Sequence, residues 1–154
     1  MGVTSPAALV QGGHAGLNVV DLDRSVSFYT RVLGLEVLSE SSDDDRRFAF
    51  LGSGGNLLLT LWQQSNGRFD TGHPGLHHLS FEVADLEAVR RAEATLRELG
   101  VSLHYDGIVK HNHGAESAGV FFEDPDGIRL EIYTPTGGTA APAPTQSDPA
   151  CGFF

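Results

Sequence analysis

The chain has 154 residues, 40% of them hydrophobic, and its 20 acidic and 10 basic residues give a formal net charge of -10. This length and apolar content suit one ordinary domain, or two small modules that share a core. The negative charge disfavours nucleic acid and anionic membrane surfaces as partners. We therefore expect a small-molecule substrate, with no nucleic-acid and no membrane partner.

The sequence also carries signs of the compartment. No apolar run approaches the ~20 residues that a membrane helix needs, and the N-terminus lacks a signal-peptide pattern. The one cysteine, Cys151, excludes an internal disulfide framework and fits a reducing environment. These features predict a cytoplasmic protein.

Two segments at the ends of the chain lack hydrophobic periodicity. Residues 1–11 are expected to be loose, and the Pro-, Ala- and Gly-rich residues 136–154 are expected to form a flexible tail. The terminal pair Phe153-Phe154 either docks on the folded body or stays frayed. The folded domain is therefore predicted to span residues 12–135.

The first half of this domain, about residues 12–65, begins with "HAGLNVVDLDRSVSFYTRVLGLEVL". It predicts an alternating strand, a helix capped by Asp21 or Asp23 and ended by Gly34, and a second strand. The stretch "RRFAFLGSGGNLLLTLW" then predicts a hairpin.

The second half, about residues 75–135, repeats this order. "HLSFEVADLEAVRRAEATLRELGVSL" predicts a strand, a helix capped by Asp85 and ended at Gly100, and another strand, and "AGVFFEDPDGIRLEIYT" predicts a hairpin. His14 precedes an Asp-Leu pair by seven residues, and His78 precedes the second Asp-Leu pair by the same seven. The sequence thus predicts an α+β fold of two βαβββ modules.

Strand periodicity sorts the candidate ligands, because alternate residues of a strand share a face. His77 falls with the apolar residues of its strand and is predicted to face the core. His14, His78 and Glu131 fall on the polar faces of their strands, and Tyr133 shares the face of Glu131. We therefore expect the three polar faces to line one cavity.

The set His14, His78 and Glu131 predicts a metal site. Two imidazoles and one carboxylate leave up to three open positions on an octahedral divalent ion such as Fe(II) or Mn(II). A substrate with two adjacent oxygen atoms, and dioxygen, are suited to such positions.

Paired modules that carry "H-x-x-L-x-V-x-D-L", "FEDPDG" and "RLEIY" resemble the vicinal oxygen chelate superfamily, which includes glyoxalase I, extradiol dioxygenases, fosfomycin-modifying enzymes and bleomycin-binding proteins. The resemblance covers about residues 12–135. It implies a curved mixed sheet around a metal cavity, with ligands at the starts of the module-opening strands and in the closing strands. It also implies a homodimer, with modules paired within or between chains, and a divalent metal: Fe(II) is favoured, with Mn(II), Zn(II) and Ni(II) as alternatives.

One position departs from part of this superfamily. Glyoxalase I and methylmalonyl-CoA epimerase, another member of this superfamily, generally carry Glu or Gln in the last strand of the first module, at the repeat counterpart of Glu131. Here the counterpart is predicted to be Leu59, with Thr60 the nearest polar residue. Because both activities rely on a second carboxyl or amide beside the metal, this departure disfavours them.

The loop "VKHNHGAES" supplies a candidate for proton transfer. The resemblance to extradiol dioxygenases places His113 at the position of an acid or base, with His111 as the less favoured alternative and Phe121 where a tyrosine is expected. Tyr133 is a further candidate for hydrogen bonding to substrate. The alternative for "HNH" is a solvated polar turn.

The favoured hypothesis is an Fe(II)-dependent, ring-cleaving dioxygenase of extradiol type that acts on a catechol-like vicinal diol. A glyoxalase-like lyase or isomerase, or a fosfomycin-type thiol transferase, is the first alternative. A binding protein that confers resistance by sequestering an antibiotic or metabolite is the second.

Overall fold

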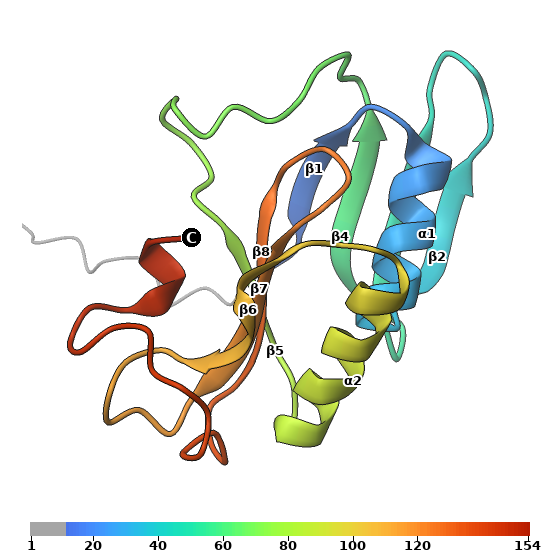
Figure 1. The fold of residues 1–154 in the computed structure, drawn as a ribbon. Coiled ribbons are helices and arrows are strands. Elements are labelled where there is room, and N and C mark those ends of the chain that lie inside the picture. Colours follow the sequence, from blue (N-terminus) through green and yellow to red (C-terminus); the bar gives the residue numbers. More distant parts are fainter. Residues whose placement is uncertain (1–11) are drawn as a thin grey trace, which may run out of the picture.

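The structure is a computed structural model that describes residues 12–154, so the prediction of a loose segment over residues 1–11 lies outside it. Eight strands and two α-helices follow one another in two similar series (Figure 1). The elements are β1 Ala15–Val19, α1 Leu22–Leu33, β2 Glu36–Ser41, β3 Phe48–Ser53, β4 Asn56–Gln63, β5 Leu79–Glu82, α2 Leu86–Glu98, β6 Leu103–Lys110, β7 Ala118–Glu123, β8 Arg129–Thr134 and the short 3₁₀ helix η1 Ala150–Gly152.

The strands form two sheets with the same topology. The strand orders are β1-β4-β3-β2 and β5-β8-β7-β6. In each sheet the first and last strands of the module pair in parallel, and the other pairs are antiparallel. The predicted α+β fold of two βαβββ modules is confirmed.

The helix boundaries follow from local chemistry. The side chain of Asp21 accepts a hydrogen bond from the Arg24 amide at 3.0 Å, and Asp85 caps α2 in the same way. Gly34 ends α1 with φ of 66°, a left-handed conformation that glycine adopts without steric cost. Of the two cap residues predicted for α1, Asp21 is therefore the one that serves.

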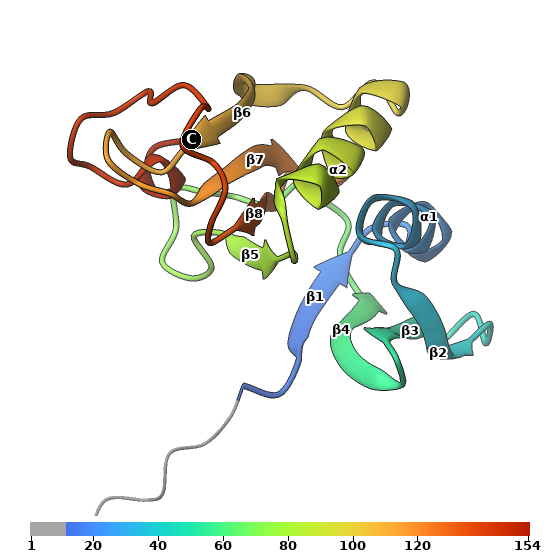
Figure 2. The same ribbon diagram turned by 90° about the horizontal axis from the view of Figure 1, so that it is seen from below.

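The core lies between the helices and the sheets. Each helix packs on its own sheet and the two helices contact each other (Figure 2), so one continuous apolar core joins the modules. Its most deeply buried members include Val19, Leu51, Leu59, Leu61, Val89, Leu96, Val120 and Leu130. The face of each sheet opposite its helix is left for other contacts.

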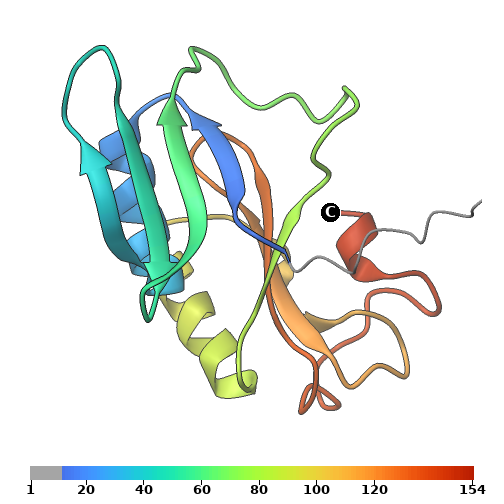
Figure 3. The ribbon, with the colours of Figure 1, turned by 180° about the vertical axis from the view of Figure 1, so that it is seen from behind.

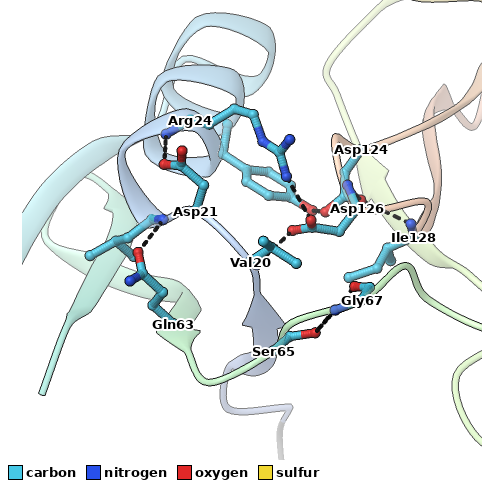
Figure 4. Close-up of polar contacts among 11 residues, drawn as sticks. Val20, Asp21, Arg24, Gln63, Ser65, Gly67, Asp124, Asp126 and Ile128 are labelled. Atoms are coloured by element: carbon cyan, nitrogen blue, oxygen red, sulfur yellow. Dashed lines mark hydrogen bonds and ion pairs between the residues drawn. The ribbon is translucent and has the colours of Figure 1, made fainter. Parts of the chain in front are cut away.

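A polar clamp joins the "DPDG" turn between β7 and β8 to the first module (Figure 4). The buried Tyr29 hydroxyl donates to Asp124 Oδ2 at 2.8 Å. Asp126 accepts hydrogen bonds from the Val20 amide at 3.3 Å and from Arg24 Nη2 at 2.8 Å. Burial raises the pKa of Asp124. The turn therefore fixes how the two modules sit against each other.

The C-terminal segment, residues 136–154, lies along the sheet of the second module (Figure 3). The Lys110 amide donates to the Pro142 carbonyl at 2.8 Å, and the amide of the buried Ala150 donates to the His111 carbonyl at 2.7 Å. Composition predicted a flexible tail, whereas the structure gives the segment defined partners. Backbone groups make many of these contacts, and hydrophobic periodicity carries no signal of them.

The clamp predicts a difference in stability between replacing Asp126, in the turn between β7 and β8, and replacing Asp23, in the first turn of α1. Replacing Asp126 with alanine leaves a partly buried amide and a guanidinium without their acceptor, so we expect a loss of about 2 kcal/mol in the free energy of unfolding. Asp23 pairs with Arg47 but is 82% exposed, so Asp23→Ala should cost no more than about 0.5 kcal/mol. Urea denaturation of both variants measures this difference, and equal losses would contradict the clamp.

Candidate metal centre

The parallel pairing of β5 with β8 brings a histidine and a carboxylate together. Ser80 lies opposite Glu131 in this register, and His78 lies two residues before Ser80. His78 Nε2 is 3.6 Å from Glu131 Oε2, and the Glu131 side chain is only 3% exposed. Two of the three predicted ligands are therefore adjacent in the structure.

The separation of these two atoms fits a shared divalent ion. Donor atoms about 2.1 Å from an ion and at a tetrahedral angle are roughly 3.4 Å apart. Burial lowers the pKa of His78, although the charge of Glu131 opposes this effect. The lowered pKa favours the neutral imidazole, which is the form that binds a metal.

A second histidine contacts the other oxygen of the same carboxylate. His111 Nε2 forms a short hydrogen bond with Glu131 Oε1, and His111 Nδ1 is 2.8 Å from the Ser117 hydroxyl. The hydrogen bond to Glu131 raises the pKa of His111. An imidazole held in this way can keep or release a proton beside the carboxylate.

His113, the favoured acid or base in the sequence, lies elsewhere. Its side chain is exposed, and its amide donates to the Gln146 carbonyl at 3.2 Å. The resemblance to extradiol dioxygenases favours His113 by its spacing from Glu131, whereas in the structure it is His111, directly after β6, whose ring reaches the carboxylate. The structure therefore favours His111, the alternative of the pair, for a role at this carboxylate.

His77 is exposed, so the prediction that it faces the core is wrong. Both histidines precede β5, which begins at Leu79, and strand alternation does not extend to them. His77 Nδ1 is 2.8 Å from His78 Nδ1, and its Nε2 is 3.4 Å from an Arg129 nitrogen. His77 thus contacts the ring nitrogen of His78 that faces away from Glu131.

The register corrects the predicted counterpart of Glu131. In the first module Gly16 pairs with Thr60, as Ser80 pairs with Glu131 in the second. The counterpart is therefore Thr60 and not Leu59, which is fully buried in the core. Thr60 accepts a hydrogen bond from the Trp62 indole at 3.0 Å. The first module still has no carboxylate or amide at this position.

Within one chain His14 lies outside the cluster, and Tyr133 borders it. His14 is exposed just before β1, in the other sheet, and is not a member of the ligand cluster found among residues 12–154. The Tyr133 hydroxyl donates to Glu82 at 2.9 Å, and its ring packs edge-on against His111. The prediction that all three polar faces line one cavity is therefore not met within a single chain.

Sequence reasoning missed Cys151. Its sulfur completes a group with His78 and Glu131 in which the ligand atoms all lie within 4.8 Å of one another. Burial and the charge of Glu131 raise the pKa of its thiol, an effect that a bound cation would reverse. The only signal in the sequence was the apolar pair that follows the cysteine.

A cavity of about 580 Å³ lies between α1, the segment that follows α2 and the end of β7. It is lined in part by Arg24, Phe28, Leu99 and Asp124. Arg24 and Asp124 already have partners in the clamp between the modules. None of the residues that line the cavity belongs to the group formed by His78, Glu131 and Cys151.

Two βαβββ modules, with a histidine just before one strand of a parallel pair and a buried carboxylate in the other strand, define the class of two-module vicinal oxygen chelate proteins. Residues 12–132 match the Glyoxalase/Bleomycin resistance protein/Dioxygenase superfamily, and the chain belongs to this family. No helix of residues 12–154 is long and apolar enough to cross a membrane.

Individual relatives have different activities in their names. The chain is 30% identical to a lactoylglutathione lyase of Neisseria meningitidis, over 81% of this chain and 91% of that one. It is 29% identical to a catechol-2,3-dioxygenase of Bacillus subtilis, over 79% of this chain but only 40% of the relative. A glyoxalase/bleomycin resistance protein/dioxygenase domain from Frankia superposes with a TM-score of 0.71 at 28% identity, covering 85% of this chain and 96% of that one.

The contact between His111 and Glu131 predicts a pH dependence of stability in the metal-free protein. Because the folded pKa of His111 is raised, its contribution is complete below the unfolded value of about 6.5 and is lost as pH rises through the folded value. The difference in unfolding free energy between wild type and His111→Gln should therefore shrink as pH rises. Urea denaturation of both proteins at a series of pH values, from below about 6.5 upward, measures this difference. His113→Gln is the control, and a difference that grows with pH would contradict the assignment.

Proposed function

We propose that this protein is a metal-dependent dioxygenase of extradiol type that cleaves a catechol-like ring. The observation that carries this proposal is the pairing of His78 with the buried carboxylate of Glu131, together with a threonine, Thr60, at the counterpart of Glu131 in the first module. With His14 as the predicted third ligand, the donor set would be two histidines and one carboxylate. A two-histidine, one-carboxylate set with open positions is typical of non-haem Fe(II) oxygenases. Fe(II) is accordingly the favoured metal, with Mn(II), Zn(II) and Ni(II) as alternatives.

We propose that His78 and Glu131 hold the ion together with His14 of a second copy. His14 is the repeat equivalent of His78, and its exposed position leaves it free to enter another site. A homodimer related by a two-fold axis would then form two identical sites, each with ligands from both chains.

The metal and the surrounding residues would have separate roles in the reaction. When bound, the metal supplies Lewis acidity and positions for two adjacent substrate oxygens. His111 would accept or return a proton beside Glu131, and the buried ring of Phe121, opposite Glu131 in the sheet, would form an apolar wall. Phe121 has no hydroxyl, so any hydrogen bond to substrate must come from elsewhere, with Tyr133 as the predicted candidate.

A lyase or isomerase of glyoxalase type is the second candidate. The chain covers 91% of a lactoylglutathione lyase, whereas it covers only 40% of the catechol dioxygenase. Against this, Thr60 cannot act as the second carboxyl that proton transfer needs. Oxygen uptake with a panel of catechols, run beside a lactoylglutathione lyase assay, separates the two candidates. Lyase activity without oxygen uptake would overturn the dioxygenase proposal.

The proposed site predicts that bound metal is lost when His78 is replaced but not when a neighbouring histidine is replaced. His78→Ala should reduce the bound metal well below one ion per chain, because a direct ligand is removed. His73→Ala removes an exposed histidine of the preceding loop and should leave the metal content unchanged. Elemental analysis of the purified variants provides the measurement. Full metal content in His78→Ala would exclude this site.

Sharing of ligands between chains predicts complementation. Dimers of His14→Ala and dimers of His78→Ala should both be inactive. A mixed dimer has one site that lacks both histidines and one intact site, so random association should restore about a quarter of wild-type activity. The two variants are co-expressed with different tags and assayed together. No recovery in verified mixed dimers would mean that each site belongs to one chain.

A further inference from the structure

The thiol of Cys151 reaches the proposed metal site from a segment outside both modules. The sulfur, a His78 nitrogen and a Glu131 oxygen lie within 4.8 Å of one another, close enough to share one ion. Cys151 is the only cysteine of the chain and is not in a disulfide. A nitrogen, an oxygen and a sulfur thus converge at this site, and only two of them, those of His78 and Glu131, belong to the three ligands predicted from the modules.

The residue before the cysteine is held on both sides of its peptide unit. The Ala150 amide donates to the His111 carbonyl at 2.7 Å, and the Ala150 carbonyl accepts from the Tyr105 hydroxyl at 2.8 Å. Tyr105 and Asp106 have φ of 59° and 60°, a region that costs non-glycine residues about 1–3 kcal/mol each. They lie in the irregular part of β6, between His104 and Val109. This strained bulge places the hydroxyl that holds the segment.

The last residue fixes the segment beyond the cysteine. The Phe154 ring lies 4.9 Å from that of Phe121, 5.3 Å from that of His104 and 5.8 Å from that of His78, measured between ring centroids. Its carbonyl oxygen accepts a hydrogen bond from Arg129 at 2.9 Å. Cys151 is therefore positioned from both directions, and the ring covers the ligand histidine.

We propose that Cys151 is a metal ligand, and that its thiolate takes a coordination position beside His78 and Glu131 when the ion binds. This inference rests on the proposed metal site. The thiol releases its proton to solvent as the metal–sulfur bond forms, and thiolates are strong ligands for Zn(II), Co(II) and iron. The thiolate then takes one of the up to three positions that His14, His78 and Glu131 would leave open on an octahedral ion, and two positions remain for a substrate with two adjacent oxygens.

Cobalt(II) substitution tests this proposal without reference to turnover. The wild-type protein loaded with Co(II) should show the near-ultraviolet charge-transfer absorption of a cobalt–thiolate bond, and Cys151→Ser should lack it. Because the chain has one cysteine, the band has one source. Ser147→Ala, an exposed residue of the same segment, is the matched control and should keep the band. Cys151→Ser should also weaken Co(II) affinity by at least about tenfold.

The outcomes separate this inference from the one on which it rests. Wild-type and Cys151→Ser spectra that coincide, in a protein whose Co(II) binding depends on His78, would overturn the role of Cys151 and leave the metal site in place. Co(II) binding that is absent, or unaffected by His78→Ala, would overturn the metal site and this inference together. Protection of Cys151 from alkylation by Co(II), read by mass spectrometry, should accompany the band.

Discussion

The burial of the Glu131 carboxylate in the middle of the second sheet is the constraint on which the candidate site depends. A carboxylate taken out of water is strongly destabilising unless it is paired. The parallel register of β5 with β8 provides one partner, His78, and the loop after β6 provides another, His111, one for each oxygen. The fold therefore places a buried carboxylate between two histidines at the position where the proposed ion would bind.

The two modules share one fold but carry different residues at equivalent positions. The same strand pairing in the first module places Gly16 opposite Thr60, and Thr60 accepts a hydrogen bond from the Trp62 indole. That module has kept the histidine before its first strand and has no carboxylate in its last. In the account proposed above it contributes His14 to a second copy, while the second module of that copy contributes the charged half of the site. The "DPDG" clamp sets the relation between the two modules, and so between the two half-sites of each chain.

Much of this arrangement could be predicted from the sequence, because it follows from local rules. Asp21, Gly34 and Asp85 are at the helix ends that their chemistry favours, and the equal spacing of His14 and His78 from their Asp-Leu pairs aligned the two modules correctly. His78 and Glu131 were also predicted as neighbours. The errors lie where periodicity does not apply. His77 precedes β5, so the alternation of that strand does not apply to it. The predicted counterpart of Glu131 was Leu59, one residue before Thr60, because the sequence does not determine the register in which the strands pair. The choice of His111 over His113 depends on the path of a loop, and Cys151 is brought to the site by backbone hydrogen bonds and a terminal ring.

Anomalous X-ray diffraction from crystals grown with the bound metal, recorded at its absorption edge, tests the central claim most directly. The account predicts one strong anomalous peak per site, in contact with His78 Nε2 and a Glu131 oxygen. A peak beside the exposed His113, or no peak near Glu131 in fully loaded crystals, would contradict it.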